Sequence, residues 1–239
     1  MAAALTAPAA AQSSDSVSTI GWSQIAIATG AIAALSVIDG NVNRAFIGTS
    51  SSTRVVARQF DRFGDLTGMG PIVGGLALAG LVSHRKPLVR AAIKAAESVA
   101  LASAFAEGSK YLVGRVRPYG DPDLDGYDFR FYSGSPSFPS GHSSAAFALA
   151  TSLADAANNM WARIGLYGLA AGTGWARLAE DQHWLSDVAA GMAVGILSAR
   201  TIGGRVRLLG IPTPSLLKAP VGAGLGWTVP LPEGGARRP

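Results

Sequence analysis

The 239-residue sequence contains no cysteine and is poor in charged residues. The lack of cysteine excludes disulfide bonds and thiolate-bound metal ions. Charged residues make up 15% of the chain, whereas a typical soluble domain has about 25%. Hydrophobic residues account for 49%. This composition indicates a chain that either buries most of its surface or contacts a membrane.

The basic excess of the chain is not gathered into clusters. The net charge is +5 and the isoelectric point is about 9.9, but there is no run of five or more basic residues and no nucleic-acid-binding motif. We therefore expect no nucleic-acid partner. An anionic substrate or an anionic membrane surface explains the same excess.

Long, undiluted apolar runs are also missing. A membrane-spanning helix needs about 20 predominantly apolar residues, and the uncharged stretches 17–38 and 66–83 are diluted by Gly, Ser, Thr or Gln. The segment 87–117 carries Arg90, Lys94 and Glu97 at helical spacing, and lipid tolerates such a charged stripe poorly. The sequence therefore favours a globular exported domain over an integral membrane protein, and membrane association stays open.

Apolar segments of helical length recur along the chain, which predicts one all-α domain over residues 17–206, a bundle of six to seven helices with the active site at helix ends. The predicted helices cover residues 22–38, 70–83, 87–117, 142–158, 161–176 and 184–202.

The two ends of the chain differ from this domain in composition. Residues 1–16 carry Ala9 and Ala11 in the positions of an export-signal cleavage site, so we expect the remnant of an export signal; a disordered Ala/Ser leader is the alternative. Residues 207–239 are rich in Gly and Pro, which predicts an irregular C-terminal tail.

The first polar block, "KYLVGRVRP", ends in a proline that stops a helix. Lys110 and Arg117 are seven residues apart, so on one helix they would project side by side. Arg115 would lie on the opposite side, as a solvent or interface charge. Taken alone, this pair is typical of a solvated helix face.

The second block, "SFPSGH", precedes an apolar helical run. Ser140, Gly141 and His142 are therefore expected at a helix N-terminus, where free backbone N–H groups and the helix dipole attract an anion. An ordinary Ser N-cap explains the same pattern without a ligand. A histidine in that first turn is the less ordinary feature.

The third block, "RLAEDQHWLSDV", concentrates ionisable residues in an apolar region. Arg177 is predicted to end one helix, and Glu180 and Asp181 to open the next. His183 and Asp187 would then share a helix face. A carboxylate that orients one imidazole nitrogen leaves the other free to attack, although a helix-surface ion pair has the same spacing.

Together, the three blocks resemble the signature of the type 2 phosphatidic acid phosphatase superfamily, which also includes class A acid phosphatases and vanadium-dependent haloperoxidases. Ten signature positions match in order, with gaps of 20 and 34 residues between the blocks. The resemblance covers residues 87–203. One position departs from it: Ala176 stands where the family usually has Ser, which removes a supporting hydroxyl.

The resemblance implies a metal-independent phosphohydrolase that forms a phosphohistidine. His183 would attack phosphorus while Asp187 orients its ring, and His142 would protonate the leaving oxygen and then activate water. The phosphate-binding residues would be Lys110, Arg117, Ser140, Gly141 and Arg177. No metal or other cofactor is expected, and vanadate should inhibit as a phosphate mimic.

The implied substrate is a phosphate monoester, either a phosphorylated small molecule or a phosphorylated lipid. The expected location is the periplasm or the periplasmic face of a bacterial inner membrane. Two alternatives remain open. A vanadium-dependent haloperoxidase would hold vanadate with the same residues, and a non-catalytic anion-binding, membrane-associated protein would bind phosphate without hydrolysis.

Overall fold

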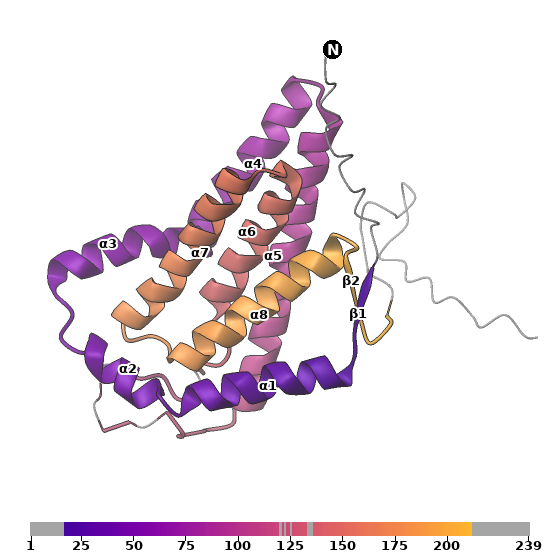
Figure 1. Cartoon of the computed structure of the whole chain (residues 1–239). Coiled ribbons are helices and arrows are strands. Elements are labelled where there is room, and N and C mark those ends of the chain that lie inside the picture. Colours follow the sequence, from indigo (N-terminus) through magenta and orange to yellow (C-terminus); the bar gives the residue numbers. More distant parts are fainter. Residues whose placement is uncertain (1–16, 120, 122, 125, 133–135, 212–239) are drawn as a thin grey trace, which may run out of the picture.

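The computed structural model is almost entirely helical, which confirms the predicted all-α class. It describes residues 17–119, 121, 123–124, 126–132 and 136–211, so the predicted leader 1–16 and the tail after residue 211 lie outside the described residues. Figure 1 shows the helices gathered into one bundle. In chain order the elements are β1 (Ser18–Ile20), α1 (Trp22–Ser36), α2 (Asp39–Phe46), α3 (Ser51–Asp61), the 3₁₀ turn Arg62–Gly64, α4 (Leu66–Val82), α5 (Lys86–Val113), α6 (Gly141–Ala157), α7 (Met160–Ala179), α8 (Leu185–Ile202) and β2 (Val206–Leu208).

Helix α6 forms the centre of the bundle and packs against α5, α7 and α8. Every residue from Ser143 to Ser152 is buried, and most of them are Ala or Ser, so neighbouring helices approach closely. A Cβ atom at Gly195 of α8 would lie 2.3 Å from the Ser144 carbonyl oxygen and 2.8 Å from the Ala148 nitrogen. Glycine is therefore required at this helix crossing.

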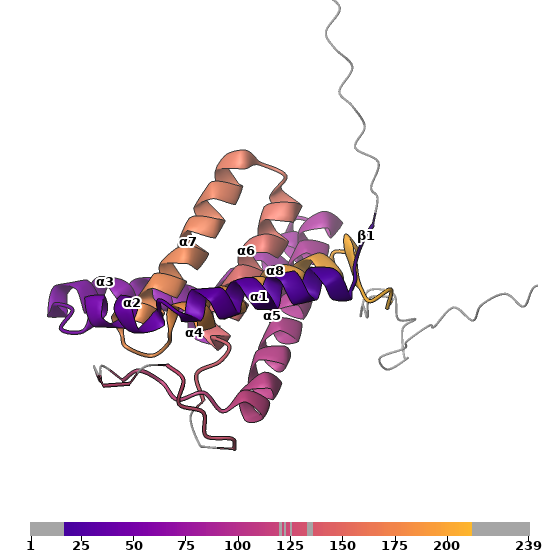
Figure 2. The same cartoon turned by 60° about the horizontal axis from the view of Figure 1, so that its bottom comes forward.

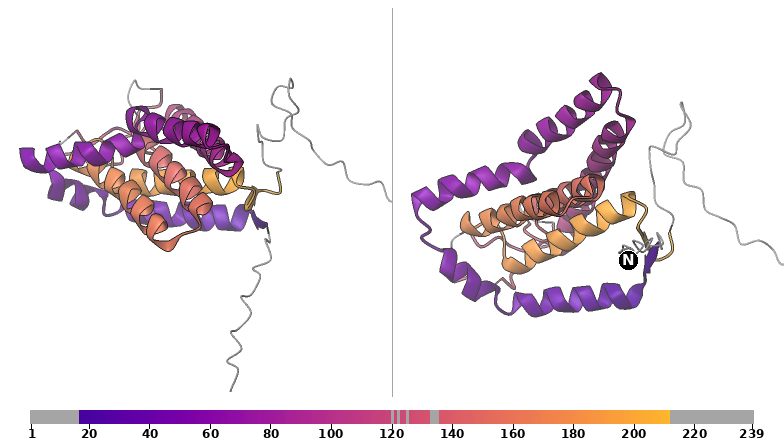
Figure 3. Two further views of the ribbon diagram at one scale, coloured as in Figure 1. Left: turned by 90° about the horizontal axis from the view of Figure 1, so that it is seen from above. Right: turned by 45° about the horizontal axis from the view of Figure 1, so that its top comes forward.

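The four N-terminal helices surround this centre. Figure 3 shows α6, α7 and α8 enclosed between the α1–α2 pair and the α3–α4 pair. Helix α3 packs on α7, where the ring of Phe60 meets that of Trp175 edge-on with centroids 6.1 Å apart. Helices α2 and α3 were not predicted, because their sequences are polar and α2 begins with the turn-like "DGN".

Helix α5 ends four residues before the predicted boundary. Its last residue is Val113, and Gly114 follows with φ of 62°. A Cβ atom on Gly114 would lie 2.5 Å from the carbonyl oxygen of Arg130, so this reversal of the chain needs glycine. The prediction that Lys110 and Arg117 share a helix face is therefore wrong, since Arg117 lies beyond the helix. Figure 2 shows the loop between α5 and α6 gathered at one end of the bundle.

Helices α1 and α4 carry no charged residue and are largely uncovered. None of the α1 residues is buried, and in α4 only Met69 and Gly80 are buried. Within the described part of the chain, α8 is long and apolar enough to cross a membrane. Two bent pairs, α1 with α2 (51°) and α3 with α4 (49°), are also long and apolar enough if each counts as one span.

The far end of the bundle, opposite the α5–α6 loop, is closed by two short strands. Strand β1 pairs in parallel with β2, with Ser18 opposite Val206. This pairing joins the segment before α1 to the segment after α8. The described start of the predicted tail, residues 207–211, therefore contributes to a small sheet.

Candidate active site

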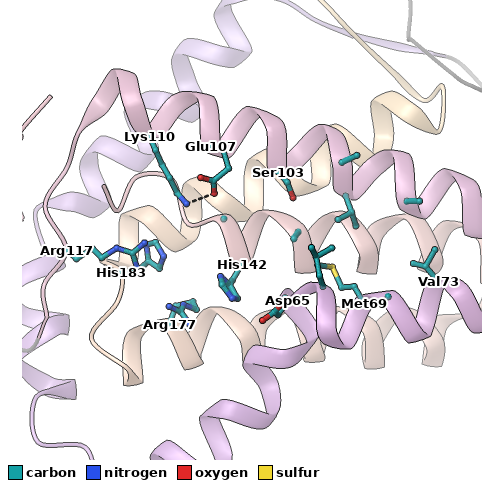
Figure 4. Close-up of a pocket in the computed structure, with 18 residues that line it drawn as sticks. Asp65, Met69, Val73, Ser103, Glu107, Lys110, Arg117, His142, Arg177 and His183 are labelled. Carbon is teal, nitrogen blue, oxygen red and sulfur yellow. Dashed lines mark hydrogen bonds and ion pairs between the residues drawn. The ribbon is translucent and has the colours of Figure 1, made fainter. Parts of the chain in front are cut away.

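One cavity brings most of the predicted site residues together. It has a volume of about 640 Å³ and lies between α4, α5 and the ends of α6 and α7 (Figure 4). Two predicted residues, Ser140 and Asp187, do not line it but are fully buried. The predicted residues that do line it are Lys110, Arg117, Gly141, His142, Arg177 and His183.

His183 lies in the connection between α7 and α8 rather than within a helix. Helix α8 begins at Leu185, and Trp184 before it is extended. The Asp187 carboxylate accepts a hydrogen bond from the Trp184 backbone N–H at 2.9 Å and lies 3.6 Å from Nδ1 of His183. The prediction that His183 and Asp187 share a helix face is thus wrong, because His183 precedes the helix. The two side chains are nevertheless close to each other. With Nδ1 next to Asp187, Nε2 is the ring nitrogen available for attack.

Burial controls the protonation of His183. The residue is 3% exposed, and this burial lowers its pKa to about 4, although the Asp187 carboxylate acts in the opposite direction. The imidazole is therefore neutral at pH 7. A neutral imidazole has the lone pair that a nucleophile needs.

His142 lies in the first turn of α6, as the sequence predicts. Ser140 caps this helix, since its side chain accepts a hydrogen bond from the Ser143 backbone N–H at 3.3 Å. The Nε2 atom of His142 lies 3.7 Å from the Asp61 carboxylate. Because Gly141 also lines the cavity, an anion bound beside it would meet the positive end of the α6 dipole.

Two cations of the cavity are paired with carboxylates. Lys110 Nζ donates to Glu107 Oε1 at 2.5 Å, as Figure 4 shows. Arg177 Nη1 donates to Asp61 at 2.8 Å and to Glu180 at 3.0 Å. These carboxylates hold positions on the two cations that the oxygens of a bound phosphate would otherwise use.

Arg117 reaches the cavity from the loop after α5. Its Nη1 atom donates to the side-chain oxygen of Gln182 at 3.0 Å. Partial burial lowers the pKa of the Arg117 guanidinium, and the nearby Arg177 acts in the same direction. Lys110 and Arg117 therefore reach the same cavity because the chain reverses direction at Gly114, and not because they share a helix face.

Glu180 and Asp181 end α7 instead of opening α8, so their predicted placement is wrong. Glu180 is the C-terminal cap of α7, and Asp181 has φ of 55°. The Asp181 carboxylate accepts a hydrogen bond from Arg54 at 3.0 Å. This sharp turn, rather than a helix start, leads the chain back to His183.

Arg115 is buried and ion-paired, which overturns its prediction as a solvent or interface charge. It is 3% exposed and donates to Asp187 and to Asp39, both at 2.7 Å. Its guanidinium also lies 5.4 Å from the centroid of the Trp184 ring. Asp39 was not predicted as a site residue, although one signal exists in the sequence: it is the only charged residue between Asp15 and Arg44.

No group of three or more His, Asp or Glu side chains in the described part of the chain is arranged to hold a metal ion. The cations at the cavity are side chains: Lys110, Arg117 and Arg177. They can supply the positive charge that a metal ion supplies in other phosphoryl-transfer sites. The expectation of a reaction without metal or other cofactor stays a prediction.

The chain is similar in sequence to known proteins. Residues 91–204 match the model of the PAP2 superfamily. Lipid A 1-phosphatase of Porphyromonas gingivalis is 32% identical over 131 residues, which cover 53% of this chain and 27% of that protein. The chain thus spans about a quarter of the length of this curated relative.

Two solved structures share the fold. The transmembrane PAP2 type phosphatidylglycerolphosphate phosphatase from Bacillus subtilis superposes with a TM-score of 0.59 and 20% identity, over 75% of this chain and 90% of that one. LpxE from Aquifex aeolicus superposes with a TM-score of 0.53 and 20% identity, over 69% and 94% of the respective chains.

Proposed function

We propose that the chain, of which residues 91–204 match the PAP2 superfamily model, hydrolyses phosphate monoesters of lipids through a phosphohistidine intermediate. The observation that carries the proposal is the convergence of two histidines and three cationic side chains on one cavity. His183 is neutral and backed by a carboxylate, as a nucleophile requires. His142 lines the same cavity. Burial and the nearby Arg177 lower its pKa, whereas the Asp61 carboxylate at 3.7 Å favours the protonated ring that an acid at the leaving group needs.

The reaction takes two steps. Nε2 of His183 attacks phosphorus, the bond from phosphorus to the ester oxygen breaks, and His142 gives its proton to that oxygen. His142 then takes a proton from water, the resulting hydroxide attacks phosphorus, and the phosphorus–nitrogen bond breaks to release inorganic phosphate. Lys110, Arg117 and Arg177 stabilise the charge on the non-bridging oxygens in both steps.

A lipid substrate fits the shape of the cavity. Away from the histidines, the lining changes to apolar side chains of α4 and α5. Figure 4 shows Met69 and Val73 of α4 on this side, facing α5. An alkyl chain between the two helices would put the phosphate beside His142, while the apolar part of the substrate stays away from water. The apolar part is lined by Leu66, Met69, Val73, Ala96, Val99 and Ala100.

The uncovered apolar helices favour a place within a membrane over the globular exported domain that the sequence favours. A helix that is apolar on all sides is either buried in protein or exposed to lipid, and α1 is not buried in protein. Helix α8 has 18 residues, or about 27 Å, close to the thickness of the hydrocarbon core. It leads from His183 to the far end of the bundle.

Charge gives the orientation in that membrane. Within the described part of the chain, the far end carries one acid, Asp155, and a surplus of basic residues, whereas most basic residues at the catalytic end are paired with carboxylates. Because cytoplasmic ends of membrane proteins are enriched in Lys and Arg, this end would face the cytoplasm and the active site the opposite side. The basic residues are Arg85, Lys86, Arg90, Lys94, Arg200, Arg205 and Arg207.

A substrate panel tests the proposal. The purified protein is assayed with phosphatidate, phosphatidylglycerol phosphate, lipid A and p-nitrophenyl phosphate, each with and without EDTA. We expect release of inorganic phosphate that EDTA does not reduce, a lower KM for the lipids than for p-nitrophenyl phosphate, and no release by the His183→Ala variant. Equal activity of that variant, or strong loss with EDTA, would contradict the proposal. Halide oxidation with vanadate and peroxide, without phosphate release, would favour a haloperoxidase.

A further inference from the structure

Asp39, the first residue of α2, is a fully buried carboxylate outside the segment that matches the PAP2 model. One of its oxygens accepts a hydrogen bond from the Ser186 backbone N–H at 2.9 Å. The other carboxylate oxygen accepts a hydrogen bond from the Ser186 hydroxyl. It also accepts one from Arg115, at 2.7 Å. A buried carboxylate costs free energy unless it is fully paired, and here three donors pair it.

The contacts of Asp39 continue to the nucleophile. Arg115 donates one N–H to Asp39 and another to Asp187, each at 2.7 Å. Asp187 in turn lies 3.6 Å from Nδ1 of His183. A continuous chain of charged contacts, with its members nearly or fully buried, thus leads from α2 to the imidazole.

The net charge of these contacts explains how a second carboxylate, that of Asp39, can assist the nucleophile. Arg115 and Asp187 alone would form a neutral pair, and the guanidinium would offset the negative charge that His183 experiences. Asp39 gives the three groups together one net negative charge. The imidazole becomes positively charged when it bonds to phosphorus, and a negative neighbour stabilises that state. The second carboxylate also holds Arg115 from its other side, which fixes the position of Asp187.

We infer that Asp39 is a positioning residue for the nucleophile, and that it acts on His183 through Arg115 and Asp187. The inference rests on the proposed function, since it assigns a role within that reaction. It makes α2 part of the active site even though Asp39 does not line the cavity. Helix α2, which lies outside the matched segment 91–204, then takes part in catalysis.

Asp39→Asn tests the inference, because the amide has nearly the same shape and lacks the charge. We expect kcat to fall by about 10- to 100-fold, with KM within twofold of its original value because Asp39 does not contact the phosphate. The matched control is Asp155→Asn, which removes a carboxylate that pairs with Arg205 at the far end. That control should keep kcat. Equal losses in the two variants, or an unchanged kcat in Asp39→Asn, would overturn the inference.

A milder variant covers the case in which Asp39→Asn does not fold. Ser186→Ala removes the hydroxyl that donates to Asp39 and accepts from Arg115, and leaves both charged groups in place. We expect a fall in kcat of about three- to tenfold with unchanged KM. Thermal unfolding of each variant checks that the protein is folded. A folded Ser186→Ala protein with the original kcat would count against the inference.

A readout other than activity separates this inference from the proposed function. The chain has three histidines, so nitrogen NMR with labelled histidine resolves His183, assigned by its loss in His183→Ala. We expect one neutral tautomer, with the proton on Nδ1, and a mixture of tautomers in Asp39→Asn. A single, unchanged tautomer in the variant would overturn the inference. An inactive wild-type protein with the expected tautomer change would contradict only the proposed function.

Discussion

The position expected for the substrate phosphate is partly occupied by the side chain of Glu107. Its carboxylate accepts from Lys110 at 2.5 Å, and a Cβ atom on Gly141 would lie 3.2 Å from the same oxygen. The carboxylate therefore lies near the N-terminus of α6, where an anion would bind. A phosphate must displace it or share Lys110 with it.

Glu107→Gln should strengthen the binding of phosphate. The variant removes a competing negative charge, but the side chain is 60% exposed, so solvent screening limits the gain to a few-fold. We expect a lower inhibition constant for inorganic phosphate, measured by competition with p-nitrophenyl phosphate. Asp128→Asn, at an exposed pair with Arg130, is the matched control. Unchanged or weaker inhibition in Glu107→Gln would show that the carboxylate does not compete.

The protonation of His183 gives a second prediction for a single residue. Its pKa is lowered to about 4 by burial, so protonation, which removes the attacking lone pair, occurs only as the pH falls through that value. We expect the imidazole signal of His183 in an NMR titration to change near pH 4 and to stay constant above pH 6. A midpoint at 6.5 or higher would mean that the ring is not desolvated as described.

Among the helices and loops, the sequence predicts those features that depend on the spacing of residues within a short segment. The histidines at 142 and 183 and the cations at 110, 117 and 177 are predicted because each block is short. All six longer helices, α1 and α4 to α8, are predicted because apolar segments of helical length recur along the chain. The partners from α2 and α3 could not be found in this way. Asp39 meets Arg115 across 76 residues of sequence, and Asp61 meets Arg177 across 116. No spacing rule connects positions so far apart.

Loop conformation was the other source of error at this scale. The early end of α5 depends on the contact of Gly114 with Arg130, and the position of His183 depends on the turn at Asp181. The first depends on Arg130, which is 16 residues further along the chain, and the second depends on the positive φ angle of Asp181. The prediction that "KYLVGRVRP" is helical to its proline is therefore wrong, because α5 ends at Val113. The prediction that a helix opens at Glu180 is also wrong, because α8 begins at Leu185.

The crossing of α6 and α8 gives a prediction for these elements. Gly195→Ala would place a methyl group against the α6 backbone, which should cost about 1–3 kcal/mol of stability and move α8, which follows His183. Gly168→Ala in α7 is the matched control, because nothing lies within 4 Å of the added Cβ. The control should be neutral or slightly stabilising. Comparable unfolding temperatures for the two variants would contradict this account of the crossing.

The described part of the molecule has a catalytic end and, about 27 Å away along the 18 residues of α8, an end with a surplus of basic residues. The lack of cysteine makes its orientation measurable, since a single introduced cysteine is the only thiol. Ser52, in the first turn of α3, and Ser83, directly after α4, are both exposed. The start of α3 and the end of α4 lie at opposite ends of the α3–α4 pair (Figure 1). In spheroplasts, a membrane-impermeant maleimide should label Ser52→Cys at once and Ser83→Cys only after permeabilisation. The reverse pattern, or equal labelling of both, would contradict the proposed orientation.

Trapping the covalent intermediate shows directly whether His183 is the nucleophile. In His142→Ala the second step lacks its base, whereas p-nitrophenolate is a good leaving group that needs no proton, so the first step can proceed. After rapid quenching at alkaline pH, peptide mass spectrometry should find one acid-labile phosphate on His183 and none in the His142→Ala/His183→Ala double variant. A folded His142→Ala protein that carries no phosphate, or carries it on another residue, would show that His183 is not the nucleophile.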